Sequence, residues 1–308
     1  MAIHERVYQR MSARPVALAG RPWTIIARVI GVHVMRSWKT RLVMFAAVAP
    51  GLMFALAIYF ATRNEEDLLS LARQFALTSI TTLDDVTPEV WQRVAANLLY
   101  VLMGHVQLWF GLILTPMLGA TLVAEDLRTQ AHEVYMSRPL RPRDYVLGKA
   151  AVIGSRLMFV LAVPPLLVLA IGNVLIPSSF LPCVHFYAWV VLFAAVVAVS
   201  NALVMTGVSA LTRSARYATA IWFLIYFVTW VVSTILFGTT GNRWFELVSW
   251  RSNQQIILSE LLSLEPLHEA LVAMPSITHT AWPSVLILVL ASWWGWKVTI
   301  GKMRPRHG

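Results

Sequence analysis

Hydrophobic residues are concentrated in six long runs along this sequence, and polar residues fill the segments between them. The runs cover residues 42–61, 95–123, 150–176, 184–211, 218–237 and 281–300. A helix needs about 20 apolar residues to cross a hydrocarbon layer of roughly 30 Å, and every run reaches that length. The pattern therefore predicts an all-α integral membrane protein with six transmembrane helices.

The composition agrees with a membrane protein. Of the 308 residues, 58% are hydrophobic and 13% are charged, which differs from the balance of a soluble domain. A net charge of +10 can indicate a nucleic-acid-binding protein, but here the basic residues alternate with runs of Val, Leu and Phe. We therefore expect no nucleic-acid partner. The single cysteine, Cys183, excludes an intrachain disulfide and every multi-cysteine metal motif.

The charges between the runs predict an orientation in the membrane. The leader (1–41), the loop 124–149, the turn at 212–217 and the C-terminal end hold 19 of the 25 Lys and Arg residues. The segments 62–94 and 238–280 hold five Lys and Arg residues but ten of the 15 acids. Because short basic segments stay in the cytoplasm, we expect both termini to be cytoplasmic and the protein to lie in the cytoplasmic (inner) cell membrane.

Three segments outside the spans have their own expected structure. Residues 22–38 of the leader carry an apolar stripe at spacings of three and four, which predicts an amphipathic interfacial helix: Trp23, Ile26, Ile30 and Val34. A partly ordered basic tail is the alternative. Segment 238–280 predicts short helices on the extracytoplasmic side, where they could contact an extracytoplasmic partner. Residues 301–308 form a cytoplasmic tail.

Four polar side chains lie within the predicted spans. Asn97, His105 and Gln107 belong to the second span and Asn201 to the fourth. Such residues either line a translocation pathway or hydrogen-bond to a neighbouring helix, and the helix contact is the commoner case. We also expect Pro116 to break the second span shortly before the loop that follows it.

Small residues recur at intervals of four in the fourth span: Ala194, Ala198, Ala202, Thr206 and Ala210. Such a stripe allows a second helix to approach closely. The sequence leaves open whether that helix belongs to the same subunit or to another.

Known catalytic motifs are missing from the sequence. It contains no GxxxxGK[ST] segment, in which backbone amides and a lysine hold nucleotide phosphates, and no HExxH or GxSxG motif. All 15 acids lie in or beside loops, which weakens the case for a proton- or sodium-coupled carrier. We therefore expect no catalytic residue, metal site or bound cofactor in this chain.

The loop 124–149 is the most informative polar segment. Its residues read EDLRTQAHEVYMSRPLRPRDYVLGK from Glu125. Pro139 and Pro142 cannot continue a helix, so the segment should fold as a short helix followed by a rigid turn. Its arginines can pair bidentately with carboxylates on a partner. From charge alone, a solvated loop that only fixes the orientation is the simpler interpretation.

The order of these residues resembles the loop between the second and third spans of type-2 ATP-binding-cassette (ABC) exporter permeases. There an acidic residue leads to a short helix, a Ser-Arg-Pro turn and a Tyr-x-x-Gly-Lys segment. Thr129-Gln130-Ala131 stands where members often have Gly-Thr. The resemblance implies that this coupling loop docks an ABC ATPase subunit through these residues: Glu125, Asp126, Arg128, Thr129, His132, Glu133, Ser137, Arg138, Pro139, Arg141, Arg143, Tyr145 and Lys149.

The resemblance further implies a permease that exports a substrate while a separate subunit binds ATP and Mg and hydrolyses the ATP. Two permease subunits would pair as a homodimer or heterodimer within the lipid bilayer. Two alternatives stay open, namely an ATP-independent secondary carrier or channel and a membrane scaffold without transport. The sequence does not identify the substrate.

Overall fold

The computed structural model of the chain describes residues 22–76, 82, 87–131, 141–176, 184–264 and 281–303. Within them, six helices are long and apolar enough to cross a membrane, which confirms the predicted all-α fold with six spans. These helices are Trp38–Ala61, Pro88–Arg128, Pro142–Leu175, Val184–Leu211, Ala215–Thr240 and Trp282–Met303.

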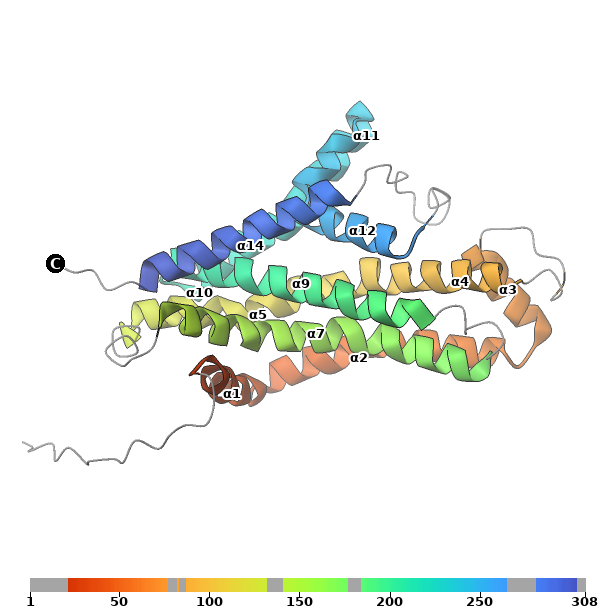
Figure 1. Cartoon of the computed structure of the whole chain (residues 1–308), viewed down its shortest axis with the longest axis horizontal. Helices are drawn as coiled ribbons and strands as arrows, with labels where there is room; N and C mark the ends of the chain where they lie inside the picture. The colour runs from red at the N-terminus through yellow and green to blue at the C-terminus, as the bar shows by residue number, and fades with distance from the viewer. Residues whose placement is uncertain are drawn as a thin grey trace, which may run out of the picture.

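Helix α9 (Val184–Leu211) lies at the centre of the bundle. It packs against α5 (Leu108–Arg128), α7 (Pro142–Leu175) and α14 (Trp282–Met303), and α2 (Trp38–Ala61) packs on α7. Figure 1 shows these helices running lengthwise beside one another, whereas α11 (Thr229–Thr240) diverges from them. The remaining elements are α3 (Glu65–Ala76), α4 (Pro88–Tyr100), η2 (Val101–Gln107), α10 (Ala215–Phe223), η4 (Leu224–Val228), η5 (Arg243–Val248) and α12 (Trp250–Leu261).

The second span continues through Pro116 to Arg128, so the predicted break at Pro116 is wrong. Proline has no N–H, and the carbonyl of Leu112, four residues earlier, therefore loses its helical partner. The indole Nε1 of Trp222 on α10 donates a hydrogen bond to this carbonyl at 3.1 Å. A neighbouring helix thus satisfies the freed backbone group, which allows the span to stay helical.

The leader contains the predicted helix, α1 (Pro22–Met35). Its apolar stripe is half-buried, while Arg28 and Arg36 are exposed. Helix α1 lies across α7 and is seen nearly end-on in Figure 1. A Cβ atom on Gly148 of α7 would lie 2.6 Å from Cγ2 of Ile26, so the absence of a side chain there lets the two helices touch.

The small-residue stripe of α9 packs within the same chain. All five of its residues are buried. A Cβ on Gly154 of α7 would lie 3.8 Å from Cβ of Ala202, and a Cβ on Gly295 of α14 would lie 2.2 Å from the carbonyl oxygen of Leu203. The stripe therefore packs against α7 of the same chain, and α14 approaches the adjoining positions Leu203 and Gly207 of α9.

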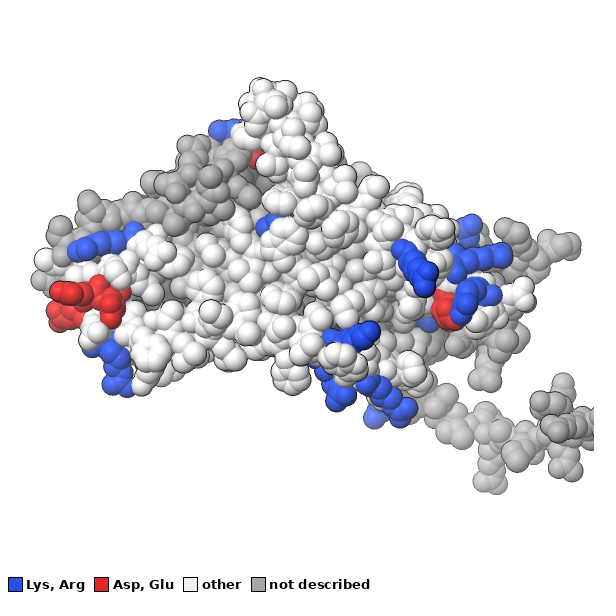
Figure 2. Space-filling view, turned by 180° about the vertical axis from the view of Figure 1, so that it is seen from behind, with Lys and Arg blue, Asp and Glu red and all other residues white. Residues whose placement is uncertain are grey.

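Charged residues separate towards the two ends of the bundle. Figure 2 shows basic residues over α1 and at the end where α5 finishes and α7 begins, and an acidic group over α3 at the other end. Met303, the last residue of α14, is buried with Val123 and Tyr145 at the basic end. Helix α1 and the end of α14 thus share the basic end, as the charge pattern predicted; which side of the membrane this end faces stays a prediction.

Replacing Gly295 with Ala should destabilise the protein, because the new methyl group would collide with the backbone of α9. Overpacking of this kind costs about 1–3 kcal/mol, so the apparent melting temperature in detergent should fall. Gly301→Ala is the matched control, since no atom lies within 4 Å of the added Cβ on the same helix. Equal stability of the two variants would contradict the close α9–α14 contact.

Candidate functional site

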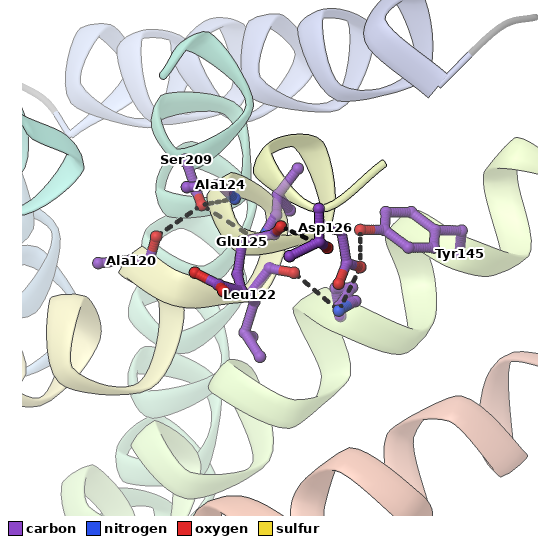
Figure 3. A network of polar contacts seen from close by, with 10 residues as sticks. Ala120, Leu122, Ala124, Glu125, Asp126, Tyr145 and Ser209 are labelled. Atoms are coloured by element: carbon purple, nitrogen blue, oxygen red, sulfur yellow. Dashed lines mark hydrogen bonds and ion pairs between the residues drawn. The ribbon is translucent and has the colours of Figure 1, made fainter. Parts of the chain in front are cut away.

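Helices α5 and α7 are joined at the ends of the coupling loop by a buried ion pair (Figure 3). Lys149 Nζ lies 2.8 Å from Asp126 Oδ2 and donates a hydrogen bond to the carbonyl of Leu122 at 2.7 Å. The hydroxyl of Tyr145 donates to the same Asp126 oxygen at 2.6 Å. Because Tyr145 and Lys149 are four residues apart, they share one face of α7 and reach one carboxylate together.

Ser209 connects the same end of α5 to α9 (Figure 3). Its Oγ donates to the carbonyl of Ala120 at 2.9 Å and accepts from the backbone N–H of Ala124 at 2.9 Å and of Val123 at 3.3 Å. Three helices therefore meet through polar contacts where the coupling loop leaves the bundle.

Both flanks of segment 124–149 are helical. Helix α5 extends to Arg128, and α7 begins at Pro142, whose fixed φ suits the first position of a helix. Gln130 adopts a left-handed φ of 56° just after α5, which prevents the helix from continuing. The predicted short helix and turn between these flanks fall largely on residues 132–140, which lie outside the described residues.

The predicted docking residues divide into buried and exposed groups. Tyr145 and Lys149 are only 1% and 4% exposed, and both bond to Asp126. The docking role of these three residues stays a prediction. The exposed candidates are Glu125, Arg128, Thr129, Arg141 and Arg143, with Arg128 paired to Glu125. His132, Glu133, Ser137, Arg138 and Pro139 lie outside the described residues.

Two of the predicted intramembrane polar residues bond to backbone carbonyls of neighbouring helices. Asn97 Nδ2 donates to the carbonyl of Phe75 at the end of α3 at 2.6 Å. Gln107 Nε2 donates to the carbonyl of Ala47 on α2 at 3.0 Å. His105 also packs locally, with its ring 5.4 Å from that of Tyr100. The contacts of Asn97 and Gln107 match the helix-contact alternative.

Asn201 belongs to a buried polar layer that the sequence did not predict. Its Oδ1 accepts hydrogen bonds from Trp250 Nε1 and Gln254 Nε2 of α12, each at 2.9 Å. The Tyr226 hydroxyl donates to the carbonyl of Leu108 at 3.0 Å and lies 3.2 Å from Gln254 Oε1. Helix α12 is therefore bonded to α9 and to the π-helical segment η4 of the fifth span.

Helix α12 packs among the spans, although the sequence predicted short outer helices in this segment. Nine of its 12 residues are buried. Gln255 Nε2 donates at 2.9 Å to the carbonyl of Gly104 in the π-helix η2, where helical hydrogen bonding is irregular. The only trace of this burial in the sequence is the run of amide side chains Asn253-Gln254-Gln255. Such a run is also typical of an exposed helix face, so it does not predict burial by itself.

A family comparison covers most of this site. The sequence model of the ABC-2 family transporter protein matches residues 108–293, more than half of the chain. The chain belongs to the ABC-2 transporter family. It is therefore a multi-pass permease of an ABC-type transporter, and permeases of this family are typically non-catalytic. The matched residues include α5, the coupling loop and α12. A search of curated proteins found no match.

Replacing Lys149 with Met should strongly destabilise the ABC-2 permease, because Asp126 would remain charged and partly buried without its partner. Breaking a buried ion pair in this way costs roughly 3–5 kcal/mol. Unfolding in detergent measures the loss, and adding Asp126→Asn should recover part of it. The control is Arg128→Met, whose pair with Glu125 is exposed and should change stability by less than about 1 kcal/mol. Equal effects would contradict the buried pair.

We expect the stability of the permease to depend on pH through Glu246. Its Oε2 is buried and has no hydrogen-bond partner in the part of the chain that the structure describes. Burial raises the pKa of this carboxyl to about 7, and the charge of Arg243 opposes the shift. The folded state therefore holds the proton more tightly than the unfolded state, so stability should fall as the pH rises from about 4.5 to about 7.

Glu246→Gln removes this titration. Melting temperatures measured from pH 4.5 to pH 7.5 should fall with pH in the unaltered protein, and the slope should be smaller in the variant. A control is Glu260→Gln, on the following helix α12. Identical slopes for the Glu246 variant and the unaltered protein would contradict the raised pKa.

Proposed function

We propose that this ABC-2 permease exports a substrate by coupling to ATP hydrolysis in a separate ABC ATPase subunit that docks on the coupling loop. Membership of the family in general implies an ABC ATPase partner. The observation that carries the proposal is the Asp126–Lys149 pair with Tyr145, because it joins the two helices, α5 and α7, from which the basic loop leaves the bundle. A solvated loop that only sets orientation does not need such anchoring.

The contacts around the loop describe how movement would enter the bundle. Displacement of the loop would act on α5 and α7 together through the buried ion pair, and on α9 through Ser209. Helix α1 would follow α7, since Ile26 packs directly against Gly148. An ATPase can drive such a movement only if it contacts the loop differently in its two states.

The proposal includes further partners and an orientation. ATP and Mg would be bound by the ATPase subunit, and a second permease subunit would complete the transporter as a homodimer or heterodimer. The basic end of the bundle (Figure 2) would face the cytoplasm, where the ATPase is available, in the cytoplasmic membrane.

Reversing charges on the loop should weaken ATPase binding. Arg138→Glu combined with Arg141→Glu would place acids where we expect pairs with carboxylates of the ATPase. Loss of charge-assisted hydrogen bonds worth about 1.5–3 kcal/mol each lowers affinity by roughly tenfold or more. Co-purification and transport in vesicles measure the effect, while the amount of folded permease in the membrane should not change.

A control is Arg213→Glu, which reverses one positive charge at an exposed site in the turn between α9 and α10. It should keep ATPase binding close to that of the unaltered permease. Normal yield and transport in the double variant would count against docking on the coupling loop. Transport that follows an ion gradient, with no ATPase recovered, would favour a secondary carrier.

A further inference from the structure

Arg251 is a buried cation in the first turn of α12. It is 2% exposed. Its guanidinium carbon lies 4.4 Å from the ring centroid of Trp109 on α5 and 4.8 Å from that of Trp230 on α11. The two indole rings are nearly perpendicular, at 88°, with centroids 5.5 Å apart. They form an aromatic corner, defined by Trp109 and Trp230, in which the guanidinium lies.

Arg251 has no acidic partner among the residues that the structure describes. In the described part of the chain no carboxylate lies within 4.0 Å of it, and its buried Nε has no hydrogen-bond partner. Glu246, five residues earlier, has a buried oxygen that is also without a hydrogen bond, so the two groups do not satisfy each other. The amides of Gln254 and Gln255 are engaged elsewhere, with Asn201 and Gly104 respectively, and Asn253 Oδ1 is buried without forming a hydrogen bond to Arg251.

The aromatic corner offsets only part of the cost of burying this charge. A desolvated cation–π contact contributes about 2 kcal/mol, whereas a buried ion costs several kcal/mol and usually needs a paired, hydrogen-bonded counter-charge. A guanidinium can contact rings through its faces and still donate hydrogen bonds from its edge. The group that would complete this site is therefore an oxyanion that accepts those hydrogen bonds.

The corner is also close to the surface of the chain. Trp109 and Trp230 are both half-buried, and Phe227 packs against them with ring centroids 6.0 and 5.9 Å away. The aromatic side chains beside the guanidinium are therefore partly accessible from outside the chain. Such a wall beside a cation suits an amphiphilic molecule, whose apolar part contacts the rings while its acidic group reaches the guanidinium.

We propose that Arg251, Trp109 and Trp230 form a binding site for the oxyanion headgroup of an amphiphilic molecule. The evidence for this binding site is the set of contacts described above. Only the further idea that the bound molecule is the transported substrate rests on the proposed function. Binding needs no ATPase. Failure of the binding test and failure of the ATPase test are therefore separate results.

The test uses the full chain in phosphatidylcholine nanodiscs without an ATPase, and measures equilibrium binding of radiolabelled dodecyl phosphate. Binding should saturate, and Arg251→Gln should weaken it at least about tenfold, as loss of a charge-assisted contact predicts. The matched control is Lys297→Gln, which removes a cation 5.3 Å from the Trp293 ring at an exposed position. This control should bind dodecyl phosphate as the unaltered chain does.

Competitors distinguish the sources of the oxyanion. Displacement of the probe by inorganic phosphate would show that a free anion is sufficient for binding. Displacement only by dodecanoate or other acidic amphiphiles would show that the apolar part of the ligand contributes. Both results support an oxyanion site. Equal displacement by dodecyltrimethylammonium would overturn it. So would unchanged binding in the Arg251 variant, which would leave Arg251 as a structural contact of the two indoles.

A measurement on the unaltered chain covers the case in which Arg251→Gln does not fold. Dodecyl phosphate should slow backbone hydrogen exchange in residues 250–261 relative to the uncharged dodecyl maltoside. Equal exchange with the two amphiphiles would overturn the proposal without any variant.

Discussion

The buried pair between Lys149 and Asp126 is the interaction on which the packing of the basic end of this permease depends. A charged lysine that is 4% exposed is stable only with a close counter-charge and further hydrogen bonds, and Asp126 and the Leu122 carbonyl supply them. The same pair fixes where the coupling loop begins and ends. Stability and the proposed coupling therefore rest on one contact, since α5 and α7 cannot shift relative to each other without breaking it.

The same constraint, that polar groups inside the bundle must find partners, explains the rest of the packing. Pro116 frees a carbonyl that Trp222 satisfies. Gln255 donates to the carbonyl of Gly104 in the π-helix η2, and Tyr226 donates to the carbonyl of Leu108 at the start of α5. Helix α12 is held among the spans by these bonds and by Asn201. A few buried polar atoms in the described residues lack a hydrogen-bond partner, and Arg251 is the one among them that carries a guanidinium held by aromatic contacts.

Hydropathy was sufficient to predict six spans and the amphipathic helix α1, because both depend on patterns within one stretch of chain. The order of residues around Tyr145 and Lys149 was sufficient to suggest the family that the comparison then showed. Sequence could not show that these two side chains are buried, since their depth depends on α5. The sequence also could not predict that α12 is buried. Its amides and Arg251 have the composition of an exposed helix face, and their burial depends on contacts with Gly104, Asn201 and Trp109, which lie far away in the sequence.

The most direct test of the account is cross-linking mass spectrometry on the unaltered permease purified from native membranes. The account predicts that a P-loop ATPase co-purifies and that its cross-links to the permease concentrate in residues 125–149, including the exposed ends beside Arg128 and Arg141. Recovery of an active transporter with no P-loop protein, or with an ATPase cross-linked only to other segments, would contradict the claim that ATP hydrolysis acts through the coupling loop.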